Sequence, residues 1–280
     1  MSFKIICDSC TDPVPDLLHA PEYVTVPLII RVGNQEFIDN GSLSTEELIQ
    51  RMAASPEGTG SACPAPQWYL DAFEGADDVY VITLSAELSG SYNSAIQARD
   101  IYLDEHPDAH IHVFNSHSAS AGQSALAIKL FALCRAGLPF GQVIEEGNHF
   151  IAHLSTMFVL ENLENLRKNG RLSELQALIT GTLRIKLVME GTPAGTINKV
   201  GQALSVKQAL SKLADAAAAK AQRHGIEGRT LVISHCNCPD RALYVRDLLL
   251  KKLSFDRVEI LQTGGLSTVY AGDGGVVVAF

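Results

Sequence analysis

Hydroxyl side chains gather in a loop between an apolar run and a helical pattern in the first half of the chain. Residues 79–84 are apolar and largely β-branched, which predicts a buried strand, and residues 95–103 predict a helix. In open α/β sheets ligands bind at such junctions, and the N-terminus of a helix favours an anion. We therefore predict that Ser89, Ser91 and Ser94 hold the carboxylate or phosphate of a small ligand.

The same loop also allows a purely structural interpretation. Ser89 would cap the helix and Gly90 would form a tight turn, with no ligand present. The local sequence fits both interpretations. A further carboxylate, Asp8, lies just past the first predicted strand, where it could belong to a site or cap the turns that follow.

Composition narrows the classes of protein to consider. The chain has 280 residues, of which 46% are hydrophobic, enough for one large domain or two smaller ones. Its net charge of −9 argues against a nucleic-acid-binding surface. No apolar run approaches the roughly 20 residues of a membrane span, and the N-terminus lacks the layout of a signal peptide. We expect a cytoplasmic protein.

Cysteines form two close pairs among the six in the chain. Cys7 and Cys10 make a C-x-x-C, and Cys236 and Cys238 make a C-x-C, so together they could supply thiolates for zinc or redox chemistry. The alternative is that Cys7 ends a buried strand and Cys10 lies in the turn after it. We expect no metal and no cofactor.

Up to residue 155 the chain alternates predicted strands and helices, which is typical of a mostly parallel sheet flanked by helices. Pro27 should make one of these strands an edge or bulged strand, and the Pro- and Gly-rich segment 56–66 should lack regular structure. Ser44-Thr-Glu-Glu47 is a capping box for the first long helix. Strands are expected at 3–7, 23–30, 79–84 and 110–114, and helices at 45–54, from 67, at 95–103, at 123–135 and at 139–153.

After residue 155 the pattern changes to a mixed one. A hairpin at 184–189 and 196–200 is expected beside the strands, and a glycine-rich loop should precede the last strand. We therefore predict two α/β domains, residues 1–155 with a mostly parallel sheet and residues 156–280 with a mixed sheet. Further strands are expected at 155–160, 230–235, 257–261 and the C-terminus, and helices after 160, at 204–224 and at 240–252.

A basic turn stands out in this acidic chain. It contains Arg167, Lys168 and Arg171. These cations could form a docking surface for a partner protein, or they could simply complete the dipole at the end of a solvated helix.

Motifs in the same order along the chain resemble the DegV family of bacterial fatty-acid-binding proteins. Ser61 falls where the family has a ligand-binding Thr, whereas Cys10 and Asn115 replace a usual Thr and Asp. His235, at the end of a strand, also fits the family. The family patterns and their matches are LSGTYxSA at 88–95, DSTxDL from 8, V-P-L at 26–28, TSQPSP within 56–66, DSxxASxG at 115–122, LxxLxKGGRIS within 161–173 and GTHTGPGALGVAF within 264–280.

The resemblance implies a fatty-acid carrier without catalytic residues of its own. Such proteins have two α/β domains and a long apolar tunnel, mostly in the N-terminal domain, and a separate kinase subunit phosphorylates the bound acid. Burial of the acyl chain is favourable by about 0.8 kcal/mol per CH₂, and its carboxylate needs fixed donors. The expected partners are a long-chain fatty acid and this kinase subunit, which would dock at Arg167, Lys168 and Arg171, with transient contact with a membrane surface left open. The expected ligand-binding residues are Ser61, Ser89, Gly90, Ser91, Asn93, Ser118 and Tyr270.

Two departures from the family pattern concern charge. Leu204 and Tyr270 stand where the family usually has Arg and His, so we expect less positive charge near the site. Lys207, one helical turn after Leu204, could replace that Arg.

Two other functions remain open. The first is a hydrolase or transferase that pairs Ser89 or Ser91 with His235 or His117, although the chain has no G-x-S-x-G. The second is a lipid-sensing protein that signals through its basic turn without a kinase. The absence of Walker A and G-x-G-x-x-G motifs argues against the chain being a kinase itself.

Overall fold

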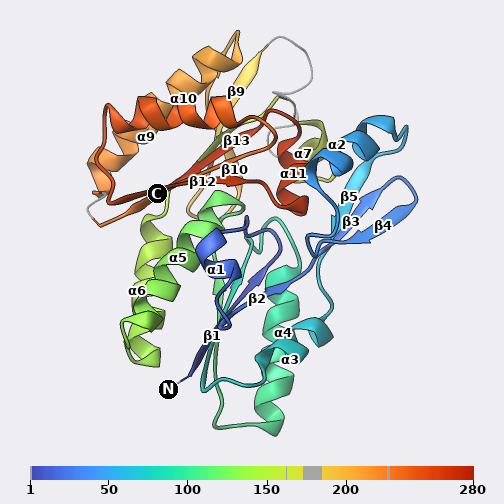
Figure 1. Cartoon of the computed structure of the whole chain (residues 1–280), viewed down its shortest axis with the longest axis vertical. Helices are drawn as coiled ribbons and strands as arrows, with labels where there is room; N and C mark the ends of the chain where they lie inside the picture. Colours follow the sequence, from blue (N-terminus) through green and yellow to red (C-terminus); the bar gives the residue numbers. More distant parts are fainter. Residues whose placement is uncertain (1, 162, 173–184, 226–227) are drawn as a thin grey trace.

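A wholly parallel sheet forms the first part of the fold (Figure 1). The computed structural model describes residues 2–161, 163–172, 185–225 and 228–280. The parallel arrangement confirms the predicted sheet, and β2 lies at its edge as Pro27 suggested. Its strands, in spatial order, are β2 (Tyr23–Val26), β1 (Phe3–Asp8), β6 (Asp78–Thr83) and β7 (His110–Asn115).

Helices cover both faces of this sheet. In β1, Ile5 and Cys7 belong to the core that includes α5 (Ala121–Arg135) and α6 (Phe140–His153), and Ile6 points to the opposite side. That opposite face is covered by α3 (Pro66–Phe73) and α4 (Ser91–Glu105), and the short α1 (Pro15–Leu18) follows β1. Burial on both faces explains why β1 and β6 are almost continuously apolar.

A mixed sheet forms the second part of the fold, as predicted. Helices α9 and α10 cover its outer face, and α5 packs against β11 and β13 on the inner face, so that α5 lies between the two large sheets (Figure 1). Because α5 belongs to the first predicted domain and these strands belong to the second, the two predicted domains share a core across residue 155. The strands, in order, are β10 (Ile197–Ala203), β9 (Lys186–Gly191), β8 (Thr156–Val159), β13 (Val276–Ala279), β11 (Thr230–His235) and β12 (Arg257–Gln262), and the outer helices are α9 (Val206–His224) and α10 (Pro239–Leu250).

A small antiparallel sheet corrects two predictions. The expected strand at 23–30 divides at Pro27, which has no N–H for a ladder, into β2 and β3 (Ile29–Val32). The segment expected to be irregular contains β5 (Thr59–Ala62), which pairs with β3, and β4 (Gln35–Ile38) lies on the other side of β3. The partner of β5 is almost 30 residues away in sequence, so no local pattern signals this strand.

Three short or capped helices complete the fold. Helix α2 (Thr45–Ala54) begins as predicted, with the Ser44 hydroxyl accepting from the Glu47 amide at 3.1 Å. Helix α7 (Glu164–Lys168) ends with Arg167 and Lys168, the first two cations of the basic turn. Helix α11 (Gly265–Ala271) occupies the segment predicted to be a glycine-rich loop. Within the described chain, no helix is long and apolar enough to cross a bilayer.

The contact between α6 and β7 gives a test of packing. A Cβ on Gly147 would lie 2.7 Å from the Phe114 ring, so Gly147→Ala should lower the free energy of unfolding, by about 1–3 kcal/mol for overpacking. Gly141→Ala in the same helix, where a Cβ meets nothing within 4 Å, is the matched control and should raise stability by up to about 1 kcal/mol. Urea denaturation measures both, and similar effects of the two substitutions would contradict this packing.

Candidate functional site

A mostly apolar cavity lies between the carboxyl ends of the parallel strands and the inner face of the mixed sheet. The volume of the cavity that the centres of water molecules can occupy is about 110 Å³. This volume is well above the roughly 10–15 Å³ that one water needs. Residues of both predicted domains line the cavity, and those of the second domain include residues of α11 and of the turn after α7. Apolar lining residues include Leu28, Leu84, Phe158, Leu166, Leu266 and Val277.

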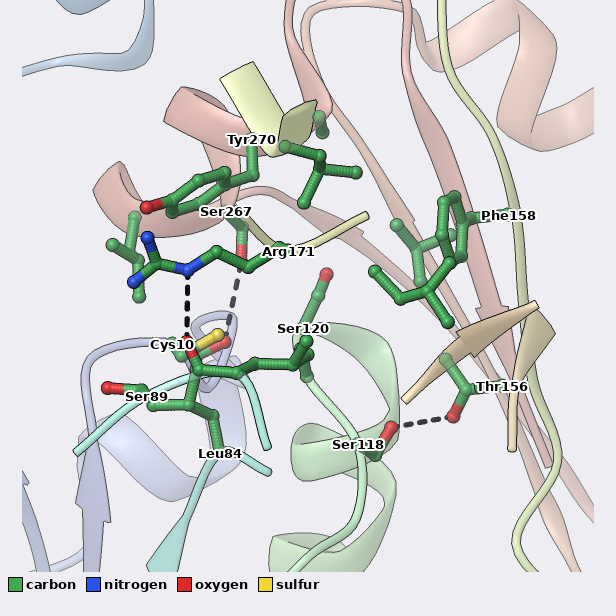
Figure 2. A pocket seen from close by; sticks show the side chains of 18 of the residues that line it. Cys10, Leu84, Ser89, Ser118, Ser120, Thr156, Phe158, Arg171, Ser267 and Tyr270 are labelled. Carbon is green, nitrogen blue, oxygen red and sulfur yellow. Dashed lines mark hydrogen bonds between the residues drawn. The ribbon is translucent and has the colours of Figure 1, made fainter. Parts of the chain in front are cut away.

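One end of the cavity carries three hydroxyl groups and a guanidinium. Ser61, Ser89, Tyr270 and Arg171 all line it, and Figure 2 shows Ser89, Arg171 and Tyr270 on the same side. The Ser61 and Tyr270 hydroxyls lie 2.8 Å apart, within hydrogen-bonding distance. The Arg171 guanidinium lies over the Tyr270 ring, 5.7 Å from its centroid. We call these four residues the head-group cluster.

Backbone carbonyls fix the orientation of Arg171. Its Nε donates to the Leu88 carbonyl at 3.0 Å and one terminal nitrogen donates to the Asn169 carbonyl at 2.6 Å. Its other terminal nitrogen has no hydrogen-bond partner among the described residues. Arg171 can therefore offer a cationic donor to an anion in the cavity.

Asn169 holds the strand of Ser61 against the turn of Arg171. Its side-chain amide donates to the Thr59 carbonyl at 2.8 Å. Gly60 faces the same side chain so closely that a Cβ there would lie 3.0 Å from the Asn169 oxygen. The close approach of these backbones brings Ser61 and Arg171 to the same end of the cavity.

Asp8 is a fully buried hub for the surrounding loops. Its carboxylate accepts from the Leu84 amide at 2.8 Å, the Ser91 hydroxyl at 2.6 Å, the Gln123 amide at 2.9 Å and the Cys10 amide at 3.2 Å. Burial raises the pKa of Asp8, and these hydrogen bonds oppose the rise. One side chain thus connects the ends of β1 and β6 with the beginnings of α4 and α5.

Two more buried carboxylates extend this scaffold to α11. Asp12 accepts from the Ser120 hydroxyl and, at 2.9 Å, from the Gly264 amide. Asp39 accepts from the Leu266 amide at 2.9 Å. Burial raises the pKa of Asp12, and it raises the pKa of Asp39 to about 6.

The predicted ligand-binding residues divide into two groups. Ser61, Ser89, Ser118 and Tyr270 line the cavity, whereas Gly90, Ser91 and Asn93 do not. Their roles toward a ligand stay predictions. This placement nevertheless separates side chains that can reach a ligand from those that shape the loop.

The residues outside the lining have local structural surroundings. The Ser91 hydroxyl is fully buried and bonds to Asp8 and to the Tyr69 hydroxyl at 2.7 Å. Asn93 is exposed on α4, and Gly90 is the exposed residue that precedes this helix. Ser89 is not the helix cap of the structural interpretation, because Gly90 holds that position. The Ser89 hydroxyl accepts from the Ser91 amide at 3.2 Å and also lines the cavity.

The three cations of the basic turn have different surroundings. Arg167 forms an ion pair with Glu164 at 2.9 Å, and Lys168 is exposed. Arg171, in contrast, lines the cavity. All three cations were expected to have the same role, because spacing within a turn does not show which side chain points inward.

The two positions that depart from the charged family residues lie differently toward this cavity, because Tyr270 lines it and Leu204 does not. Leu204 is 78% exposed. Lys207 lies 5.7 Å from the centre of the Tyr244 ring, also away from the cavity. Among the described residues that line the cavity, Arg171 is the one Arg or Lys side chain.

No serine–histidine pair suited to hydrolysis forms within the described residues. His235 Nδ1 accepts from the Cys238 amide at 3.3 Å, and burial lowers the pKa of His235. His117 Nδ1 is buried, with no hydrogen-bond partner in the described part of the chain. Neither histidine is hydrogen-bonded to Ser89 or Ser91, whose bonds are given above.

The cysteine pairs have ordinary structural positions. Cys7 lies at 0% exposure in β1, as the structural interpretation predicted, and Cys10 lies in the turn after β1. All six thiols are free. Across the part of the chain that the structure describes, no group of three or more potential ligands is placed to hold a metal ion.

Comparisons with known proteins agree with the motifs. A family model described as an uncharacterised protein, DegV family, matches residues 2–280. The chain belongs to the DegV family. A DegV domain-containing protein of Streptococcus gordonii is 36% identical over 282 residues, covering 100% of this chain and 99% of the relative.

Two solved DegV-type structures match over the whole chain. One is a DegV family protein from Ruminococcus gnavus refined with vaccenic acid, at 41% identity, a TM-score of 0.96 and full coverage of both chains. The other is the Streptococcus pneumoniae fatty acid kinase B3 protein loaded with linoleic acid, at 35% identity and a TM-score of 0.90, covering 100% of this chain and 99% of that one. The DegV-like α/β fold with a parallel and a mixed sheet, predicted from the resemblance, is thereby confirmed.

Ser91 and Ser89 provide a matched test of the loop. Ser91→Ala leaves buried groups of Asp8 and Tyr69 without their partner, so the free energy of unfolding should fall by about 1–3 kcal/mol. Ser89→Ala removes one partly exposed acceptor and should cost less than about 1 kcal/mol. Urea denaturation of the two variants measures the difference. A larger loss for Ser89→Ala would contradict the structural role given to Ser91.

Proposed function

We propose that this DegV protein binds a long-chain fatty acid, with the acyl chain in the apolar cavity and the carboxylate at the head-group cluster. The observation that carries this proposal is the polarity of the cavity: apolar along its wall, with Ser61, Ser89, Tyr270 and Arg171 together at one end. A fatty acid is likewise divided into a long apolar chain and a polar carboxylate at one end. The acids bound by the R. gnavus and S. pneumoniae relatives support the proposal.

The physical balance favours an anionic lipid over a neutral one. Burial of each CH₂ contributes about 0.8 kcal/mol whatever the head group is. A carboxylate removed from water needs donors and, best, a positive charge. Arg171 has a terminal nitrogen without a hydrogen-bond partner among the described residues, and the serine and tyrosine hydroxyls supply neutral donors.

We further propose that the protein presents its bound acid to a separate kinase and has no catalytic group of its own. The name of the S. pneumoniae relative, a fatty acid kinase B3 protein, supports this partner. The exposed Lys168 and the half-exposed Arg167 lie in the turn that continues to Arg171. A partner that binds this turn would therefore lie near the carboxylate that it modifies.

The role of the head-group cluster can be tested with two ligands that have the same hydrocarbon chain but differ in the charge of the head group. Arg171→Met keeps an apolar stem but removes the cation, so the Kd for oleate should rise about 10- to 100-fold, the value of one charge-assisted bond. The Kd for oleyl alcohol, which has the same chain without a charge, should change less than about 3-fold. Isothermal titration of both ligands measures this difference.

Arg167→Met is the matched control for this test, because Arg167 is a cation in the same turn that does not line the cavity. It should leave oleate binding unchanged. Equal losses for the acid and the alcohol in Arg171→Met, or no loss for either, would contradict a carboxylate at this cluster.

A further inference from the structure

A second polar group lines the cavity away from the head-group cluster. Ser118 and Thr156 are buried, at 6% and 8% exposure, and their hydroxyl oxygens lie 2.7 Å apart. Figure 2 shows this pair on the opposite side of the cavity from Ser89 and Arg171. Two hydroxyls are thus placed where the apolar part of a fatty acid would be expected.

The hydrogen bonding of this pair is incomplete. Two hydroxyls have two protons, and the bond between them uses one. No other hydrogen bond of either side-chain oxygen exists within the described residues. One O–H donor of the pair therefore remains unmatched among the described residues, and a buried unmatched donor is costly.

The backbone is shaped to place Ser118 here. His117 and Ser120, on either side of it, have φ values of 49° and 55°, a left-handed region that is strained for residues other than glycine. Gly122 permits the approach, since a Cβ there would lie 2.0 Å from the Ser118 hydroxyl and 2.6 Å from that of Thr156. Strain of this kind persists only where the surroundings enforce it.

A larger polar cleft adjoins this end of the cavity. His117, Ser118, Thr156 and Gly191 line both spaces, so they form the wall between them. The end of the cavity that they close is consequently polar, unlike the wall formed by Leu84, Phe158 and Val277.

We propose that Ser118 and Thr156 bind an oxygen-bearing group in the tail half of the acyl chain, so that the preferred ligand is a hydroxylated fatty acid. A ligand hydroxyl can accept the spare O–H of the Ser118–Thr156 pair. A plain methylene chain leaves this donor unmatched. This inference rests on the proposed function, because it specifies which fatty acids the same cavity selects.

The test compares stearate with stearates that differ only in one hydroxyl. Binding of stearate, 2-hydroxystearate, 12-hydroxystearate and 17-hydroxystearate to the wild-type protein is measured by isothermal titration. At least one of the last two should bind about 2- to 10-fold more tightly than stearate, the value of a net hydrogen bond. The 2-hydroxy acid, whose hydroxyl lies beside the carboxylate, should not gain in this way.

Thr156→Val and Thr156→Ser form the matched pair of variants. Thr156→Val keeps the shape but removes the hydroxyl, and the ratio of hydroxystearate to stearate affinity should fall to one or below. Thr156→Ser keeps the hydroxyl and should keep the wild-type ratio. Stearate binding without preference for either tail-hydroxylated acid would overturn this inference alone, as would an unchanged ratio in Thr156→Val. Failure of every acid to bind wild type would overturn the proposed function as well.

Discussion

The loops around the cavity depend on carboxylates buried where strands end. Asp8 accepts four hydrogen bonds from four separate segments of the chain, and Asp12 and Asp39 connect the same region to α11. A buried carboxylate without partners would be strongly unfavourable. The loops must therefore keep their positions for these groups to stay satisfied, and this constraint makes the cavity wall a defined shape.

The cavity combines this polar scaffold with an apolar interior. The donors that hold the loops, such as Ser91 and Gln123, face the carboxylates and not the cavity. Apolar side chains from both large sheets then complete the wall. The polar side chains that line the cavity include the head-group cluster and, apart from it, the pair formed by Ser118 and Thr156. Such sparse polar groups fix the orientation of a ligand, while its affinity comes mostly from apolar burial.

Much of this architecture could be predicted from sequence, for physical reasons. The parallel sheet followed from apolar runs alternating with helical patterns, and the start of α2 from the box around Ser44. Strand β5 was missed because its partner β3 is distant in sequence, and α11 because its glycines suggested a loop. Within the site, the hydroxyl-rich motifs pointed to Ser61 and Ser89, and both residues line the cavity. The motifs did not distinguish the inward Ser89 from the scaffold residue Ser91, since this depends on Asp8. The inward direction of Arg171 likewise depends on carbonyls that no local pattern reveals.

The central claim, that the cavity holds an anionic lipid, is tested most directly by native mass spectrometry of the freshly purified protein. The bound molecule would be released, extracted and identified by its fragment masses. We expect one fatty acid per chain, released on denaturation. A protein that is empty, and that stays empty after incubation with fatty acids, would contradict it, and so would one that holds a ligand of another chemical class.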